Sequence, residues 1–335
     1  MKKYLLLIPL AFSLLSCGTK PAAPTSQSAS STSGSPAVVY MSHHVSDASL
    51  VAVYQALGVQ PQGRVAVKIS TGESGGNYYL KPELIGSLVR LVNGTIVECN
   101  CVYPGKRDVS QEHWQTIRDH GFLDIAPVDI MDEEGDLQIP VRDSSHIPYN
   151  LVGSHLANYD FMINLAHFKG HPMAGYGGVI KNQSIGVSSA NGKALIHTAG
   201  SRQDKDHKLS VWSNAVASTK QDHFLESMAA AAQSVADYMH GNIIYINVMN
   251  NLSVDCDCVP HGKAPQLQDV GILASTDPVA LDQACLDIIF RMEATPGNNP
   301  EPLQKRIRSR NGTHTVDYAE SIGLGTKNYT IVHID

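Results

Sequence analysis

The side chains best suited to chemistry lie between Ala166 and His197, in a segment with three histidines, three lysines, six glycines and no acidic residue. Histidine exchanges a proton or binds metal near neutral pH, and a lysine crowded by cations has a lowered pKa and becomes a better nucleophile. We therefore expect a site for a small anionic or metal-bearing molecule, with His171, His167 and Lys181 as catalytic candidates.

Other members of the same segment are candidates for ligand binding. Glycine lets the backbone approach a bound molecule closely, and lysine and asparagine supply hydrogen-bond donors. The alternative, a solvated basic loop, stays open at this point. The ligand-binding candidates are Lys169, Gly175, Gly177, Gly178 and Asn182.

A second polar loop, ECNCVYPGKR, follows the strand expected at 95–100. The carboxyl ends of strands in an open α/β sheet are where ligands bind, so this loop is expected to form the opposite wall of the pocket. Lys106 and Arg107 could hold a carboxylate or phosphate, with Asn100 beside them. An ordinary solvated turn is the competing interpretation.

Cysteines supply a candidate metal site. Cys256 and Cys258 point to the same side of an extended chain, and His261 could add a third ligand for zinc, iron or copper(I). Cys99 and Cys101 repeat the spacing, so a buried thiol pair or disulfides between the two pairs are alternatives. Cys285 falls on the apolar face of a helix and is expected in the core.

The N-terminus has the pattern of an export signal. Lys2 and Lys3 precede an apolar run that ends in Leu-Leu-Ser-Cys, which resembles a bacterial lipobox with Cys17 as the lipid-bearing residue. Residues 18–36, rich in serine, threonine, proline and alanine, are expected to form a disordered tether. Membrane attachment would then be through the lipid alone, in the cell envelope. A cytoplasmic protein with an apolar N-terminus is the alternative.

Strands and helices alternate from residue 37 to residue 335, which predicts an α/β fold of mostly parallel sheet with Rossmann-like βαβ units. A division into lobes at about 37–200 and 201–335 is one option. The chain FMINLAH at 161–167 is a continuous apolar strand that runs into the glycine-rich loop. Further strands are expected at 38–41, 65–70, 95–100, 126–131, 242–250, 270–275 and 329–334, and helices at 47–57, 82–92, 110–120, 222–240, 278–292 and 316–322.

The charge balance points to a small-molecule partner. The 25 basic and 31 acidic residues give a net charge of −6 without a basic surface pattern, so no nucleic-acid partner is expected.

Four strings together resemble the DUF362 family: HFKGHPMAGYGGVIKN, ECNCVYPGKR, NNLSVDCDC and DVGILASTDPVALDQACLD. Many members of that family are labelled iron-sulfur proteins because they carry an inserted ferredoxin-like Cys-x2-Cys-x2-Cys-x3-Cys run. This sequence has no such run, so no ferredoxin-type four-iron cluster is expected.

The glycine-rich loop also resembles that of the nickel-pincer lactate racemase family, in which a lysine carries the pincer nucleotide and a later histidine ligates nickel. That resemblance implies an acid/base role for His171, an anchoring role for Lys181 and a metal-ligand role for His197.

Two function classes follow. The first is a cell-envelope enzyme, associated with a zinc, iron or nickel ion, that acts on a small anion by proton transfer or redox chemistry. The second is a lipoprotein that binds a metal or ligand without catalysis.

Overall fold

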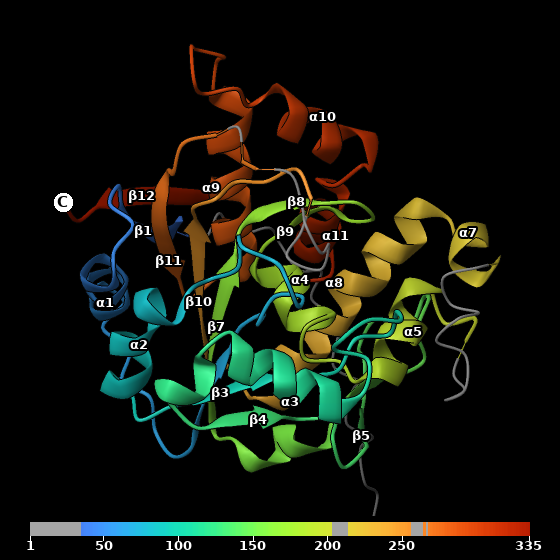
Figure 1. Cartoon of the computed structure of the whole chain (residues 1–335). Helices are drawn as coiled ribbons and strands as arrows, with labels where there is room; N and C mark the ends of the chain where they lie inside the picture. Colours follow the sequence, from blue (N-terminus) through green and yellow to red (C-terminus); the bar gives the residue numbers. More distant parts are fainter. Residues whose placement is uncertain (1–34, 203–213, 256–263, 266) are drawn as a thin grey trace, which may run out of the picture. The chain divides into compact units, whose positions relative to one another are not determined.

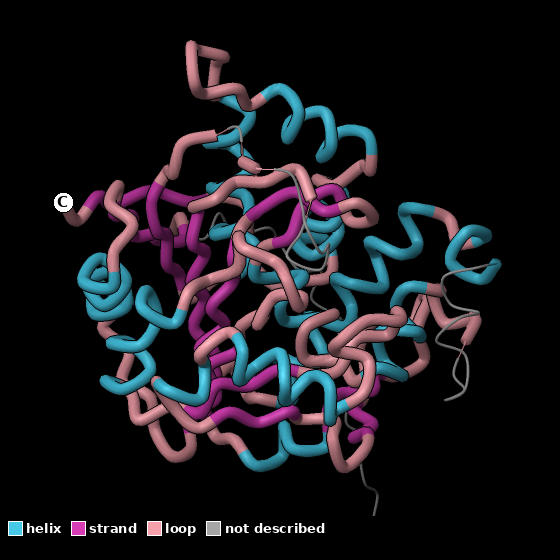
Figure 2. Tube along the Cα trace, viewed as in Figure 1, coloured by secondary structure: helices cyan, strands magenta, loops and turns pink. Residues whose placement is uncertain are grey.

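A single eight-stranded sheet carries the fold (Figures 1 and 2). The structure is a computed structural model that describes residues 35–202, 214–255, 264–265 and 267–335. The strands of this sheet follow the order β12-β1-β11-β10-β7-β2-β3-β4. They are β1 (Ala37–Ser42), β2 (Val65–Lys68), β3 (Thr95–Glu98), β4 (Val128–Ile130), β7 (Phe161–His167), β10 (Ile243–Met249), β11 (Gly271–Ser275) and β12 (Tyr329–His333).

Two short antiparallel hairpins accompany the sheet. The first pairs β5 (Asp136–Ile139) with β6 (Asn150–Gly153), and the second pairs β8 (Lys169–His171) with β9 (Gly175–Gly177).

Helices cover both faces of the sheet. Their bounds are α1 (Asp47–Ala56), α2 (Pro82–Leu91), α3 (Ser110–Asp119), α4 (Val179–Ser184), α5 (Ala190–His197), α7 (Val216–Ser218), α8 (Gln221–Tyr238), α9 (Pro278–Arg291), α10 (Glu301–Ser309) and α11 (His314–Ser321). Short 3-10 turns lie at Phe122–Asp124 and Ser154–Asn158. In Figure 1, α1 and α2 lie on the opposite side of the sheet from α4 and α8.

The central strands are apolar throughout because both of their faces are covered. Along β7, Ile163 and Leu165 belong to the core beneath α1, α2 and α3, whereas Met162 and Ala166 belong to the core beneath α4, α8 and α9. The same alternation runs along β10, where Tyr245 belongs to the core beneath α4, α8 and α9. Sequence alone cannot assign the two faces of such a strand.

The expected α/β class is confirmed, with one difference in detail. The pairs from β10 through β4 are parallel, and so is β12 with β1, but β11 runs antiparallel to both of its neighbours. Contacts group residues Pro36–Asp335 into one compact unit. Among the described residues, no helix is long and apolar enough to cross a membrane.

Side-chain caps mark the start of some of the helices. Ser46 caps α1 by accepting a hydrogen bond from the amide of Ser49, and Asp277 caps α9 through the amides of Val279 and Ala280. The elements absent from the sequence prediction are short or glycine-rich: the two hairpins and helices α4, α5, α7 and α10.

Candidate functional site

A cavity of about 270 Å³ lies where three parallel strands end. The last residues of β2, β3 and β7 are Lys68, Glu98 and His167, and all three line it. The β8–β9 hairpin and helices α4 and α5 contribute other walls. This is the edge at which open α/β sheets bind ligands. The remaining lining residues are Ser70, Cys99, Cys101, Val102, Tyr103, Arg107, Ala166, Lys169, His171, Pro172, Met173, Gly177, Gly178, Lys181, Asn182, Ile185, Gly186, Lys193 and His197.

Four lysines meet at this cavity. Lys169 and Lys181 were singled out from the sequence, whereas Lys68 and Lys193 were not. Lys68 is almost fully buried, and its Nζ donates to the Asn182 side-chain oxygen at 3.2 Å and to the carbonyl of Ile69. The expected strand ran from 65 to 70, whereas β2 ends at Lys68, which places this side chain at the ligand edge of the sheet.

Burial and like charge lower the pKa of two of these lysines, Lys68 and Lys181. Burial lowers the pKa of Lys68 to about 8, although Glu98 opposes the shift. For Lys181, burial together with Lys169, Lys68 and Lys193 lowers the pKa to about 7. A carboxylate or phosphate placed among these amines would relieve their mutual repulsion.

Glu98 is the carboxylate that lines the cavity, and its charge is already neutralised. It accepts from Arg107 Nη1 at 2.8 Å and from the Thr71 amide at 2.9 Å, with His113 Nε2 at 3.3 Å. Although burial favours its neutral form, Arg107 and His113 hold the Glu98 pKa well below its usual range. The cavity therefore keeps an excess of positive groups.

The polar side chains of the second loop have partners within the protein. Arg107 lines the cavity, but its guanidinium is engaged by Glu98 and, at 3.4 Å, by Glu73. Lys106 pairs with Glu112 at 2.8 Å, with both side chains mostly exposed. Asn100 lies outside the cavity lining and bonds to Ser110 and His113. These side chains hold the loop in place.

His171 is fixed in one tautomer by its own turn. Its Nδ1 accepts from the backbone amides of Met173 at 3.2 Å and Ala174 at 2.9 Å, so the neutral ring carries its proton on Nε2. Burial and the neighbouring Lys181, His197 and Lys169 hold its pKa well below the normal value. As a neutral ring it acts as a hydrogen-bond donor, and the general-base half of the expected acid/base role is disfavoured.

His197 has the opposite tautomer to His171, whereas His167, like His171, carries a proton on Nε2. His197 Nδ1 lies 2.7 Å from the carbonyl of Lys193, so Nδ1 donates and Nε2 is the basic nitrogen. Burial lowers the His197 pKa to about 4, and its ring stacks on Phe224. His167 Nε2 lies 2.6 Å from the carbonyl of Asn250 and donates to it.

The three glycines of the loop serve different purposes. Gly175 adopts a φ of +83° that favours glycine, and it does not line the cavity. Gly178 packs against Asp282, where an added Cβ would lie 2.3 Å from Oδ1. At Gly177 an added Cβ would lie 3.6 Å from Cδ of Lys181, so the backbone there runs beside a lysine side chain of the cavity.

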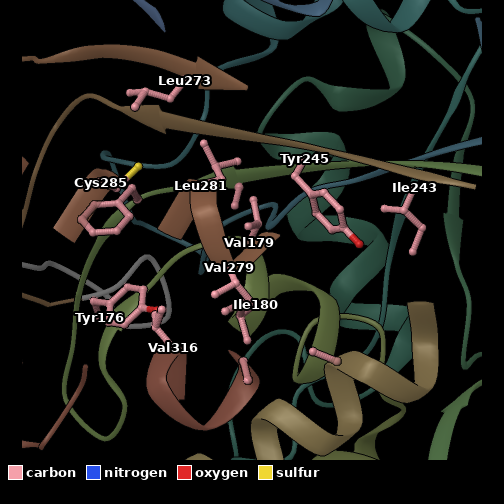
Figure 3. Packing of buried hydrophobic residues seen from close by; sticks show 14 of the residues in the cluster. Tyr176, Val179, Ile180, Ile243, Tyr245, Leu273, Val279, Leu281, Cys285 and Val316 are labelled. Atoms are coloured by element: carbon pink, nitrogen blue, oxygen red, sulfur yellow. The ribbon is translucent and has the colours of Figure 1, made fainter. Parts of the chain in front are cut away.

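Asp282 positions helix α4 through hydrogen bonds to its first two amides. Its carboxylate accepts from the amides of Val179 at 2.9 Å and Ile180 at 3.1 Å, and from Asn247 at 2.7 Å. Figure 3 shows Val179 and Ile180 of α4 packed beside residues of α9 such as Leu281. Burial raises the Asp282 pKa to about 6. Asp282 thus anchors the turn that carries Lys181.

Three of the expected metal ligands, Cys256, Cys258 and His261, lie outside the described residues. The lipidation candidate Cys17 lies outside them too. Cys99, Cys101 and Cys285 are free and buried. Burial raises the pKa of Cys99 and Cys101, and Cys101 Sγ lies 3.2 Å from the Tyr103 hydroxyl. Within the described part of the chain, no group of three or more histidine, cysteine or acidic side chains is placed to hold a metal.

The donor chemistry of the described cavity likewise does not fit a cation. Lys181 and Lys193 lie near His197 and lower its pKa, and such positive neighbours would repel a metal cation.

Comparison with known proteins identifies the family. The sequence matches DUF362, a domain of unknown function, over residues 65–287. The chain belongs to the DUF362 family. No curated protein sequence matches it.

The solved structures similar to this DUF362 protein include the lactate racemase apoprotein from Thermoanaerobacterium thermosaccharolyticum, with 13% identity and a TM-score of 0.36. The match covers 62% of this chain and 50% of the racemase chain, so the DUF362 protein aligns with half of that structure. Lactate racemase is also the family that the glycine-rich loop resembles in sequence.

Proposed function

We propose that this DUF362 protein is an enzyme that binds a small anion in the cavity and acts on it by proton transfer. The observation that carries the proposal is the convergence of four lysines on a cavity whose carboxylate, Glu98, is already paired with Arg107. Buried like charges are costly without a counter-charge, so a carboxylate or phosphate ligand would stabilise the arrangement.

The histidines and Lys181 supply complementary proton chemistry. His171 donates through Nε2, whereas His197 has a basic Nε2. A Lys181 amine with a pKa of about 7 exists in both protonation states at neutral pH, which suits a general acid or base. Together these groups could hold an anionic intermediate and move a proton.

Anion binding is tested by calorimetry with inorganic phosphate and with citrate, for the wild type, Lys181→Met and Lys193→Met. A charge-assisted hydrogen bond contributes roughly 1.5–3 kcal/mol, so each variant should bind about tenfold more weakly or worse. Lys106→Met is the matched control because Lys106 pairs with Glu112 outside the cavity. Absence of binding to wild-type protein across a panel of small anions would overturn the proposal.

We also propose export and lipid attachment at Cys17, on the strength of the N-terminal sequence pattern alone. Metabolic labelling with a radioactive fatty acid should mark the wild-type chain in a bacterial host and leave Cys17→Ser unmarked. An unlabelled wild-type chain would count against lipidation without affecting the cavity.

A further inference from the structure

Lys181 differs from the other cavity lysines in its contacts. Lys68 donates to Ile69 and Asn182, and Lys193 donates to the carbonyl of Ser188 at 2.6 Å. Lys169 also has an interaction partner. By contrast, Lys181 Nζ makes no hydrogen bond or ion pair with any residue that the structure describes. Its amine is therefore the one presented to a ligand.

The surroundings of Lys181 favour a neutral, nucleophilic amine. Val102, Met173 and Ile185 line the same cavity and supply apolar surface around the polar groups. Neighbouring cations and an apolar pocket are the two conditions that activate a lysine toward carbonyl compounds. The same cations attract a substrate that carries a negative charge.

We infer that Lys181 forms an imine with a small 2-oxo carboxylate, whose carboxylate is held by the neighbouring lysines. This inference rests on the proposed anion-binding function and names its substrate class. In a 2-oxo acid the carbonyl carbon is bonded directly to the carboxylate carbon, so one molecule can reach Lys181 and an adjacent ammonium group together. A cavity of about 270 Å³ suits such a small molecule.

The reaction needs no co-reactant. The Lys181 lone pair attacks the carbonyl carbon and the carbon–oxygen π bond opens, giving a carbinolamine. Loss of its oxygen as water, with both protons supplied by the former amine, leaves a carbon–nitrogen double bond to Nζ. His171 Nε2–H is suited to hydrogen-bond the oxygen as its charge develops. Once its nitrogen takes up a proton, the resulting iminium withdraws electrons from the substrate, which makes loss of a proton from the carbon next to the carbon–nitrogen double bond easier.

The test is reductive trapping on the intact chain. The protein is incubated with pyruvate and sodium cyanoborohydride, digested, and mapped by mass spectrometry. We expect the adduct at Lys181 in the wild type and none at that position in Lys181→Arg. Exposed Lys106 reports the background labelling of an ordinary lysine in the same digest.

Methyl pyruvate tests the contribution of the carboxylate apart from that of the carbonyl group. Its carbonyl is at least as electrophilic as that of pyruvate, but the molecule carries no charge. Attraction by the lysine cluster should make pyruvate label Lys181 about tenfold faster or more than the ester, and inorganic phosphate should suppress the difference. Equal rates with the two compounds would overturn the role given to the carboxylate.

The two proposals fail in different ways. If inorganic phosphate binds the wild type but neither pyruvate nor glyoxylate leaves an adduct on Lys181, the imine is overturned and the anion site stands. If neither phosphate nor the 2-oxo acids bind, both proposals fall. Because the adduct is mapped in the wild type, a folding defect in Lys181→Arg cannot obscure the result.

Discussion

Asp282 and Gly178 are in such close contact that a Cβ at Gly178 would lie 2.3 Å from Oδ1 of Asp282. The carboxylate belongs to α9, and the glycine directly precedes α4. This contact brings the start of α4, and with it Lys181, into a fixed position at the cavity. A buried acid on one helix thus determines where a lysine on another helix can act.

Alanine substitutions at two neighbouring glycines, Gly177 and Gly178, should have different effects on the stability of the protein. Gly178→Ala must displace Asp282 or α4, so we expect loss of stability of about 1–3 kcal/mol, typical of overpacking, and loss of phosphate binding. Gly177→Ala places its Cβ at an ordinary distance from Lys181 and should fold normally. Urea denaturation of the two variants makes the comparison. Equal destabilisation of both would contradict the assigned contact.

Asp282 should give the protein an unusual dependence on pH. Its pKa is raised from 3.8 to about 6 in the folded state, so between those values the folded chain holds a proton that the unfolded chain has lost. The stability contributed by Asp282 is therefore present below about pH 4 and is lost as the pH rises to about 6, a change of roughly 3 kcal/mol.

Asp282→Asn is the control for that prediction because its side chain cannot titrate. The free energy of unfolding of the wild type relative to Asp282→Asn should fall over this range, and a flat difference would refute it. Asp282→Ala should be less stable at every pH, since the amides of Val179 and Ile180 would lose their acceptor, at about 1–3 kcal/mol for each buried donor.

The Glu98–Arg107 ion pair is expected to be essential to the fold of the second loop. Glu98→Gln leaves a buried guanidinium without its 2.8 Å partner, which typically costs about 3–5 kcal/mol. Glu112→Gln breaks the exposed pair with Lys106 and should leave stability unchanged within error. Chemical denaturation at neutral pH compares them. Similar stability of the two variants would show that Glu98 is not a structural anchor.

The α/β class and the cavity's place at the strand ends could be predicted from sequence, because continuous apolar strands such as 161–167 reveal a covered sheet. Lys68 could not be singled out, since a lysine that ends a strand is ordinarily solvent-exposed. Lys193 was missed because its helix was not predicted. Helix α5 begins with Ala-Asn-Gly, which gives a weak helix signal.

The contacts of these side chains were harder to predict than their positions. His171 was expected to be an acid/base residue, but the amides of Met173 and Ala174 commit its Nδ1. Arg107 was expected to hold a ligand, and the structure shows its guanidinium paired with two buried carboxylates, those of Glu73 and Glu98. Such assignments depend on turn geometry and long-range contacts that residue spacing does not encode.

His171 should remain a neutral Nε2–H ring at pH values where an exposed histidine is charged. At a pH between the lowered pKa of the folded state and the ordinary value of 6.5, only the unfolded chain binds a proton at His171. The contribution of His171 to the free energy of unfolding therefore rises with pH until about 6.5. Nitrogen-15 chemical shifts of the imidazole distinguish the tautomers directly. A protonated Nδ1 near pH 6 would be incompatible with the two backbone hydrogen bonds.

The reactivity of Lys181 should follow its lowered pKa. Competitive labelling with acetic anhydride measures the fraction of free amine, so Lys181 should reach half of its maximal rate near pH 7. Lys106 should require a much more alkaline pH, because its hydrogen bond to Glu112 raises its pKa.

Inorganic phosphate should then move the Lys181 profile to higher pH, since an anion beside the amine stabilises the ammonium form. The Lys106 profile should not move, because that lysine lies outside the cavity. If phosphate left both profiles unchanged while binding was measured independently, the anion would have to sit away from Lys181. The link between the lysine cluster and the bound ligand would then fail, even though the cluster itself remained.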